Sequence, residues 1–234
     1  MKNKDIFTFR DAEKQAGPVA FSTMLKPAGS ACNLDCHYCY YLDKAVQYGG
    51  RQAVMSDELL ELYVKQYIEA NEVPTVQFCW HGGEPLLLGV DFYRKAMDFQ
   101  QKYADGKKIE NILQTNGTLV DEAWCDLFAG NNFLVGISLD GPQDIHDAFR
   151  LTKGGRPTCE RVMRTIEMFQ RSGVEYNTLS VVNRLCEGRG GEIYRFFRDT
   201  VHSRYMQFLP AVEHVVDKPG FHRPLIVSPD REGA

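Results

Sequence analysis

The chain has 234 residues, of which 44% are hydrophobic and 25% charged, and its formal net charge is −4. These values are ordinary for a globular protein that buries a sizeable core. There is no basic stretch to neutralise phosphates, so we expect no nucleic-acid partner. The apolar runs are too short to cross a bilayer and the N-terminus has no apolar leader, so we expect no membrane partner and a cytoplasmic location.

From residue 21 onward, short apolar runs alternate with amphipathic segments. In chain order, the pattern predicts strands and helices in turn: strand Phe21–Lys26, helix Ser56–Ala70, strand Thr75–Trp80, helix Asp91–Tyr103, strand Ile109–Gln114, helix Asp121–Phe128, strand Phe133–Leu139, helix Cys159–Ser172, strand Glu175–Val182, helix Glu192–Arg198 and strand Tyr205–Leu209. Ser56 suits a helix N-cap and Gly173 a helix C-cap. The segment that follows the fourth strand, up to Arg150, is expected to be a loop.

Strict alternation of strands and helices predicts right-handed crossovers and a parallel sheet. A complete eight-fold barrel needs about 250 residues, so six units favour an α/β fold of the open parallel (β/α)6 part-barrel type. In such folds the chemistry lies at the carboxyl ends of the strands. We expect an N-terminal extension at residues 1–20, a core domain at residues 21–212, and a linker at residues 213–234.

The first strand is followed by Cys32, Cys36 and Cys39, spaced C-x3-C-x2-C. Three thiolates on one short loop can hold three corners of an iron–sulfur cube. Electron-transfer clusters use four cysteines, so a set of three leaves one iron open for a ligand. The alternative is a structural zinc site, which needs four ligands. His37 is the available fourth, but its adjacency to Cys36 makes the geometry awkward.

This loop resembles the signature of radical S-adenosylmethionine (radical SAM) enzymes. The resemblance implies two cofactors, a 4Fe–4S cluster and S-adenosyl-L-methionine, and a reductant protein of the flavodoxin or ferredoxin type. It implies that the open iron binds the amino and carboxylate groups of S-adenosylmethionine. Reductive cleavage would then give a 5′-deoxyadenosyl radical that abstracts a hydrogen atom from the substrate, with the protein positioning the reacting groups.

The second strand is followed by a Gly-Gly-Glu-Pro turn that begins with Gly82, Gly83 and Glu84. Glycines let the backbone approach a ligand closely. The turn resembles the family's GGE motif, which implies that the three residues bind the cofactor, with the Glu84 carboxylate contacting its ammonium group. The alternative is a plain turn.

The ends of the later strands add cofactor candidates by the same resemblance. Gln114 or Asn116 would face the cofactor, although Asn116-Gly117 is also a turn signal. Leu209 would line the adenine side of the pocket.

Ser138 and Arg150 would contact the carboxylate or ribose of S-adenosylmethionine, and the fork of an arginine suits a carboxylate. The alternative for Arg150 is a surface salt bridge with Asp147. Asp140 and Asn183 are weaker candidates that suit a cap equally well.

The succession of KPAGSACNLDCHYCYYLDK, FCWHGGEPLL, LQTNGTLVDE and VGISLDGP is similar to anaerobic sulfatase-maturating enzymes. These oxidise an active-site cysteine or serine of a partner sulfatase polypeptide to Cα-formylglycine. The resemblance implies that Tyr41 faces the peptide substrate as a catalytic residue, and ordinary packing is the alternative. Another peptide-modifying radical SAM maturase, which forms thioether or carbon–carbon crosslinks, and a non-catalytic iron–sulfur module remain open.

The chain departs from that family in one respect. The family carries a C-terminal domain with two further 4Fe–4S clusters and a catalytic carboxylate, whereas this chain has no cysteine after Cys186. We therefore expect the 234 residues to bind the first cluster and cleave S-adenosylmethionine without completing the oxidation of a sulfatase.

Overall fold

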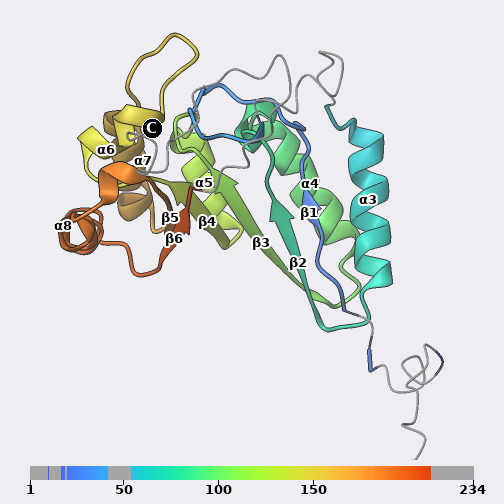
Figure 1. Cartoon of the computed structure of the whole chain (residues 1–234). Coiled ribbons are helices and arrows are strands. Elements are labelled where there is room, and N and C mark those ends of the chain that lie inside the picture. Colours follow the sequence, from blue (N-terminus) through green and yellow to red (C-terminus); the bar gives the residue numbers. More distant parts are fainter. Residues whose placement is uncertain (1–9, 11–16, 19, 42–53, 212–234) are drawn as a thin grey trace, which may run out of the picture.

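The computed structural model describes residues 10, 17–18, 20–41 and 54–211 of the chain (Figure 1). Six strands form one sheet in which strand order follows chain order and all five neighbouring pairs are parallel. In the described part of the chain, the first and last strands are not paired with each other, so the sheet stays open. The strands are β1 (Met24–Leu25), β2 (Thr75–Trp80), β3 (Lys108–Thr115), β4 (Phe133–Ser138), β5 (Glu175–Val182) and β6 (Met206–Pro210).

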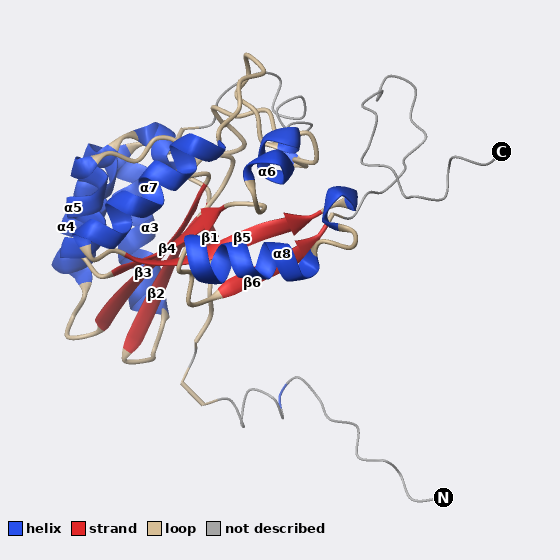
Figure 2. Cartoon of the chain, turned by 90° about the vertical axis from the view of Figure 1, so that its left-hand side faces the viewer, coloured by secondary structure: helices blue, strands red, loops and turns tan. Residues whose placement is uncertain are grey.

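Helices connect the strands, and Figures 1 and 2 show α3, α4, α5 and α7 side by side along one face of the sheet. The open α/β part-barrel is therefore confirmed. None of the helices in the described ranges has the length and apolar character that a membrane crossing requires. The helices are α3 (Asp57–Ala70), α4 (Val90–Tyr103), α5 (Glu122–Gly130), α6 (Gln143–Phe149), α7 (Cys159–Ser172) and α8 (Gly190–Arg195).

Most expected boundaries are confirmed to within two residues, because the capping residues act locally. The Ser56 side chain accepts a hydrogen bond from the Leu59 amide, and Gly173 ends α7 in the left-handed region with φ of 69°. The first strand is shorter than expected because it pairs with β2 over two residues only. Most of residues 1–20 and all of residues 213–234 lie outside the described residues, so the expected extension and linker stay predictions.

The expectation of a loop between β4 and α7 is wrong, because the segment contains helix α6. Seven residues are too few for a helix that is stable by itself. Tertiary contacts hold it instead: Ile145 and His146 are fully buried. The His146 ring also bridges the amide of Asp140 and the hydroxyl of Thr158. Sequence periodicity does not report such contacts.

A buried polar network joins β2 and β3 to helix α4. Asn111 accepts hydrogen bonds from the Trp80 indole at 2.7 Å and from the Gln100 amide at 2.9 Å, and donates one back to Gln100. All three residues are buried. Each donor would be left unpaired without Asn111, so the network fixes how α4 lies on the sheet.

We expect Asn111→Leu to lower the free energy of unfolding by about 2–4 kcal/mol. The change leaves the N–H donors of Trp80 and Gln100 without an acceptor while the side-chain volume is nearly unchanged. Urea unfolding followed by circular dichroism measures this. Glu110→Gln, on the opposite side of the same strand, is the control and should cost less than about 1 kcal/mol. Equal effects of the two changes would show that the network does not carry the predicted energy.

Candidate active site

The carboxyl ends of the strands surround a cavity of about 410 Å³. Its size falls within the range of small-molecule sites. All but one of the twelve residues predicted as site residues line it, although they come from six separate stretches of the chain; the exception is Glu84. The lining residues are Cys32, Cys36, Cys39, Tyr41, Gly82, Gly83, Gln114, Asn116, Ser138, Arg150 and Leu209.

The three cysteines lie on the loop that follows β1 and face the cavity together. Among the described residues, no set of His, Cys, Asp and Glu side chains is arranged to hold a single metal ion. His37 packs edge-on against the Phe149 ring, with ring centroids 6.2 Å apart, and does not line the cavity. The zinc alternative therefore lacks its fourth ligand.

The protein environment favours neutral thiols when no iron is bound. Burial raises the pKa of Cys32 to about 11 and that of Cys36 to about 12. The Arg150 guanidinium opposes the shift in the pKa of Cys36 without cancelling it. Iron ligation must therefore release protons from these sulfurs.

The Gly82-Gly83 turn touches the backbone of the loop that precedes the first cysteine. A Cβ on Gly83 would lie 2.1 Å from the carbonyl oxygen of Ala31, and one on Gly82 would lie 2.8 Å from that of Gly29. The Gly83 amide donates to the Gly29 carbonyl at 3.0 Å. The missing side chains thus let two loops far apart in sequence meet along one wall of the cavity.

The structure corrects the prediction that Glu84 binds the cofactor, because its side chain does not line the cavity. It is fully buried behind the turn, where its carboxylate accepts hydrogen bonds from the amides of Leu86 and Asn116 and from the Thr115 hydroxyl. All three donors lie in the protein, so the carboxylate ties the ends of β2 and β3 together. Burial raises the pKa of Glu84 to about 7, although the three donors favour its charged form.

Asn116 links the end of β3 to the cysteine loop. Its side-chain amide donates to the Asn33 oxygen at 2.9 Å and approaches the Cys32 sulfur at 3.7 Å. Asn33 in turn donates to the Thr118 hydroxyl at 2.8 Å. Asn116 is thus more than a turn residue, because it holds the first cysteine against the strand end.

Arg150 lies in a buried charge network, and the alternative of a surface salt bridge with Asp147 is wrong. Its guanidinium is 3.0 Å from the Asp140 carboxylate, and both side chains are almost inaccessible. Burial by itself would lower the pKa of Arg150, but Asp140, Tyr38 and Cys36 hold it well above its usual range. Asp147 instead caps the start of α7.

The Tyr38 hydroxyl donates to the same Asp140 carboxylate, and the Arg150 guanidinium lies 5.4 Å from the Tyr38 ring. Tyr38 and Asp140 thus attach the cysteine loop to the end of β4. The sequence analysis gave Tyr38 no role.

Gln114 and Ser138 form part of the cavity floor, where the Gln114 amide donates to the Ser138 hydroxyl at 3.2 Å. Gly136 makes this possible, because a Cβ there would lie 2.0 Å from the Gln114 oxygen. Leu209 lines the cavity from β6. Asn183 does not; its side chain caps the short turn after β5, as the alternative reading held.

Tyr41 is buried on the cavity wall, where its ring lies between the Lys26 ammonium, 5.1 Å from the centroid, and the ring of His81. Its contact with a peptide stays a prediction.

Sequence reasoning missed His81, which also lines the cavity. Its Nδ1 accepts the Gly82 amide at 2.8 Å, and burial lowers its pKa, so the ring is neutral with its proton on Nε2.

Comparison with known proteins accounts for this geometry. The model of the radical SAM superfamily matches residues 27–186. The chain belongs to this superfamily. The cluster loop and the carboxyl ends of the strands from β2 to β5 all fall within the match. Radical SAM chemistry uses a 4Fe–4S cluster and S-adenosylmethionine, and the three sulfurs beside an open cavity fit that pair.

Curated radical SAM relatives include a serine-type anaerobic sulfatase-maturating enzyme of Bacteroides thetaiotaomicron, 45% identical over 212 residues that cover 90% of this chain and 51% of the relative. A cysteine-type enzyme of Clostridium novyi is 40% identical over 204 residues, 85% of this chain and 53% of the relative. A solved structure described as native anSMEcpe with bound AdoMet and Cp18Cys peptide superposes with a TM-score of 0.77 at 36% identity, over 86% of this chain and 54% of that chain. The chain thus spans about half the length of these relatives.

We expect Gly83→Ala to lower the iron content after anaerobic cluster reconstitution and to destabilise the chain by about 1–3 kcal/mol, because the new Cβ displaces the cysteine loop. Iron analysis and thermal unfolding measure the two effects. Gly130→Ala is the matched control: a Cβ there meets no atom within 4 Å. Normal cluster loading in Gly83→Ala would show that the close approach is dispensable.

Glu84 also gives the stability of the chain a pH dependence. Its pKa rises from 4.5 unfolded to about 7 folded, so the folded chain binds the proton more tightly and loses this stabilisation as the pH rises. Relative to Glu84→Gln, the wild type should lose about 2–3 kcal/mol between pH 5 and pH 8. Denaturant unfolding across this range measures the difference. A gain in relative stability with rising pH would contradict this assignment.

Proposed function

We propose that this chain is the S-adenosylmethionine-cleaving core of an anaerobic sulfatase-maturating enzyme, which oxidises an active-site cysteine or serine of a sulfatase to Cα-formylglycine. The observation that carries the proposal is that the three cysteines, the Gly-Gly turn, Arg150 and Tyr41 all line one cavity. The 45% identity to a serine-type enzyme of this class and the likeness to a peptide-bound one support it. Both cysteine-type and serine-type relatives are similar to the chain, so the choice between the two substrates stays open.

When bound, the cluster and S-adenosylmethionine supply a 5′-deoxyadenosyl radical that removes one hydrogen atom from the Cβ of the substrate residue. The residues of the chain have to bind and orient the reactants. Cys32, Cys36 and Cys39 hold the cluster, and the close-packed turn at Gly82 and Gly83 forms the wall beside it. Holding reactants in one geometry supplies much of the catalysis in such sites.

Arg150 is proposed to bind the cofactor carboxylate. Its Nε side faces Asp140, and a guanidinium has five N–H donors, so donors remain for a second carboxylate. Asp140 and Tyr38 hold the side chain in place, which lowers the entropic cost of binding. Ser138 and Gln114, already hydrogen-bonded to each other, present polar atoms on the floor of the same cavity.

Oxidation of a serine alcohol to an aldehyde removes two hydrogens: one leaves as the abstracted atom, the other as a proton and an electron. The proton and the electron must pass to an acceptor. The first electron is proposed to come from a flavodoxin- or ferredoxin-type reductant. We place the reaction in the cytoplasm, where such reductants occur.

Anaerobic reconstitution followed by electron paramagnetic resonance tests the core of the proposal. We expect a reduced 4Fe–4S signal that changes when S-adenosylmethionine is added, with formation of 5′-deoxyadenosine. Cys36→Ser should abolish both because it removes a ligand, whereas Cys79→Ser, outside the cavity, should retain both. A cluster whose signal does not change when S-adenosylmethionine is added would instead identify a non-catalytic module.

The substrate is tested with sulfatase-derived peptides that carry Cys-x-Pro-x-Arg or its serine counterpart. We expect 5′-deoxyadenosine to form in excess of the aldehyde product. Mass spectrometry of the peptide and chromatography of the nucleoside measure the ratio. Stoichiometric aldehyde formation would contradict this expectation, and a crosslinked peptide would identify another maturase.

A further inference from the structure

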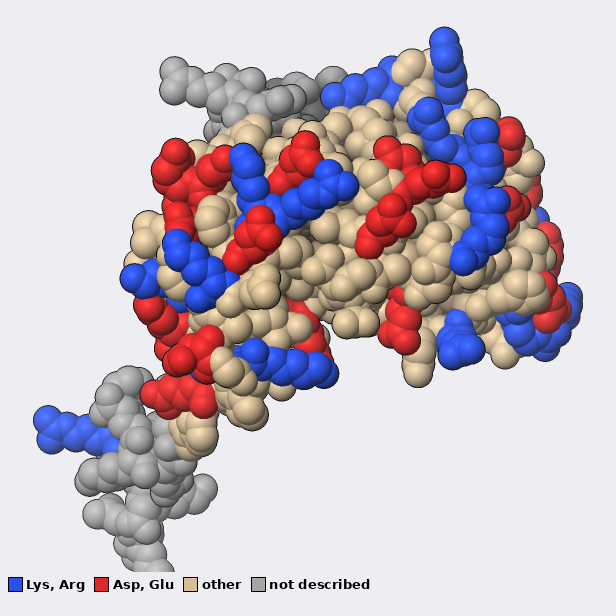
Figure 3. All heavy atoms as spheres, turned by 180° about the vertical axis from the view of Figure 1, so that it is seen from behind, with Lys and Arg blue, Asp and Glu red and all other residues tan. Residues whose placement is uncertain are grey.

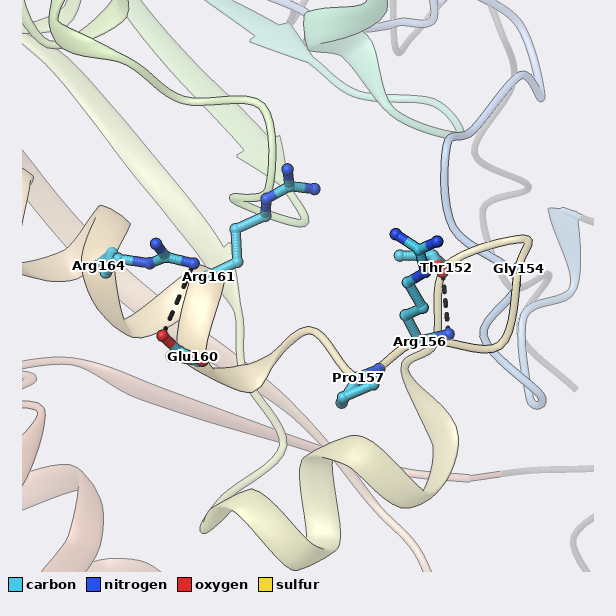
Figure 4. Close-up of a pocket in the computed structure, with 7 residues that line it drawn as sticks. All are labelled: Thr152, Gly154, Arg156, Pro157, Glu160, Arg161 and Arg164. Carbon is cyan, nitrogen blue, oxygen red and sulfur yellow. Dashed lines mark hydrogen bonds and ion pairs between the residues drawn. The ribbon is translucent and has the colours of Figure 1, made fainter.

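We propose that a basic hollow beside the cluster loop is the docking surface for an acidic electron-carrier protein. The hollow has a volume of about 480 Å³ and is formed by the hairpin at residues 151–157 and the first turns of α7. Its arginines are Arg156, Arg161 and Arg164, and Figure 4 shows that they come from both segments. The inference rests on the proposed function, because a radical SAM core needs an external electron.

The side chains that line the hollow carry a net positive charge. Arg164 lies 3.9 Å from Glu160, but Arg156 and Arg161 have no acidic side chain within ion-pair distance among the residues that the structure describes. The exposed Lys153 lies on the same hairpin. Figure 3 shows basic side chains gathered at the upper right, on the side where the hairpin lies.

Several basic residues elsewhere on the surface have acidic partners. Ion pairs join Lys95 to Asp57, Lys102 to Glu61 and Arg189 to Asp144. The net charge of the chain is −4, so a local excess of positive charge stands out on an acidic protein. Such an excess steers an oppositely charged partner to one face and speeds its association.

The hairpin that carries the hollow is paired directly with the cluster loop. Thr152 forms an antiparallel bridge with Leu34, and the Asp35 amide donates to the Leu151 carbonyl at 2.8 Å. Leu34 and Asp35 lie between Cys32 and Cys36, two of the cluster cysteines. A protein seated on the hollow therefore rests against the outer side of the loop that holds the cluster.

The hairpin also fixes the backbone position of Arg156. The Thr152 amide donates to the Arg156 carbonyl at 2.9 Å, and the Arg156 amide donates to the Thr152 hydroxyl at 3.0 Å. Arg156, Glu160, Arg161 and Arg164 are all exposed at the surface. Exposed charges on an ordered scaffold suit a carboxylate-rich protein surface better than a buried small anion.

The step served by this surface is a transfer of one electron. The reduced flavin of the carrier loses one electron, the oxidised cluster gains it, and no bond forms or breaks. The surface adds no chemistry; it raises the rate at which the two redox centres come close enough.

The test compares the cluster-loaded wild type with Arg156→Gln/Arg161→Gln. The probe is an acidic flavodoxin, in its oxidised form for calorimetric binding at low salt and in its hydroquinone form for stopped-flow reduction of the cluster. We expect about tenfold weaker binding, about tenfold slower reduction and a shallower dependence on ionic strength. Reduction by photoreduced 5-deazariboflavin, a small uncharged donor, should be unchanged.

Lys65→Gln/Arg94→Gln is the matched control, because it removes the same charge from exposed positions on α3 and α4. It should retain wild-type binding and reduction. An equal loss in this control, an unchanged flavodoxin rate in the arginine variant, or a loss only of affinity for the sulfatase peptide would each overturn the proposal. Failure of the proposed function looks different, since S-adenosylmethionine would then stay intact even with 5-deazariboflavin.

Discussion

The site depends on one close contact, in which the loop that bears the cysteines lies directly on the Gly-Gly turn after β2. A side chain at Gly83 would collide with the Ala31 carbonyl, so the contact exists only because both glycines lack a Cβ. β1 itself contributes a pairing of two residues. The loop is therefore held less by its own strand than by backbone hydrogen bonds with the turn and with residues 149–151, and by the side-chain amide of Asn116.

Burial of charge is the second constraint. Glu84 joins the ends of β2 and β3 from behind the cavity, and Asp140 joins Tyr38 and Arg150 at the end of β4. Each carboxylate is buried and meets more than one donor or charge, which offsets part of the cost of removing it from water. One cation, Arg150, then lies on the cavity wall in a fixed orientation, where a cofactor carboxylate would need it.

Electrons must reach the cluster from outside, and the hairpin that pairs with the cluster loop carries Arg156, which has no acidic partner among the described residues. The same hairpin braces the loop through Leu34. Structural support and charge are thus combined in the short segment between α6 and the first turns of α7.

The sequence by itself determined the alternation of strands and helices, their caps, and the set of residues on the cavity wall, because periodicity, capping and strand-end position are local signals. It missed α6, gave Glu84 a ligand-binding role, offered Asp147 as a partner for Arg150, and passed over His81. Only the tertiary structure decided these, since each depends on atoms distant in the chain. A short helix persists because His146 is buried, and a carboxylate faces away from a cavity because three donors from elsewhere surround it.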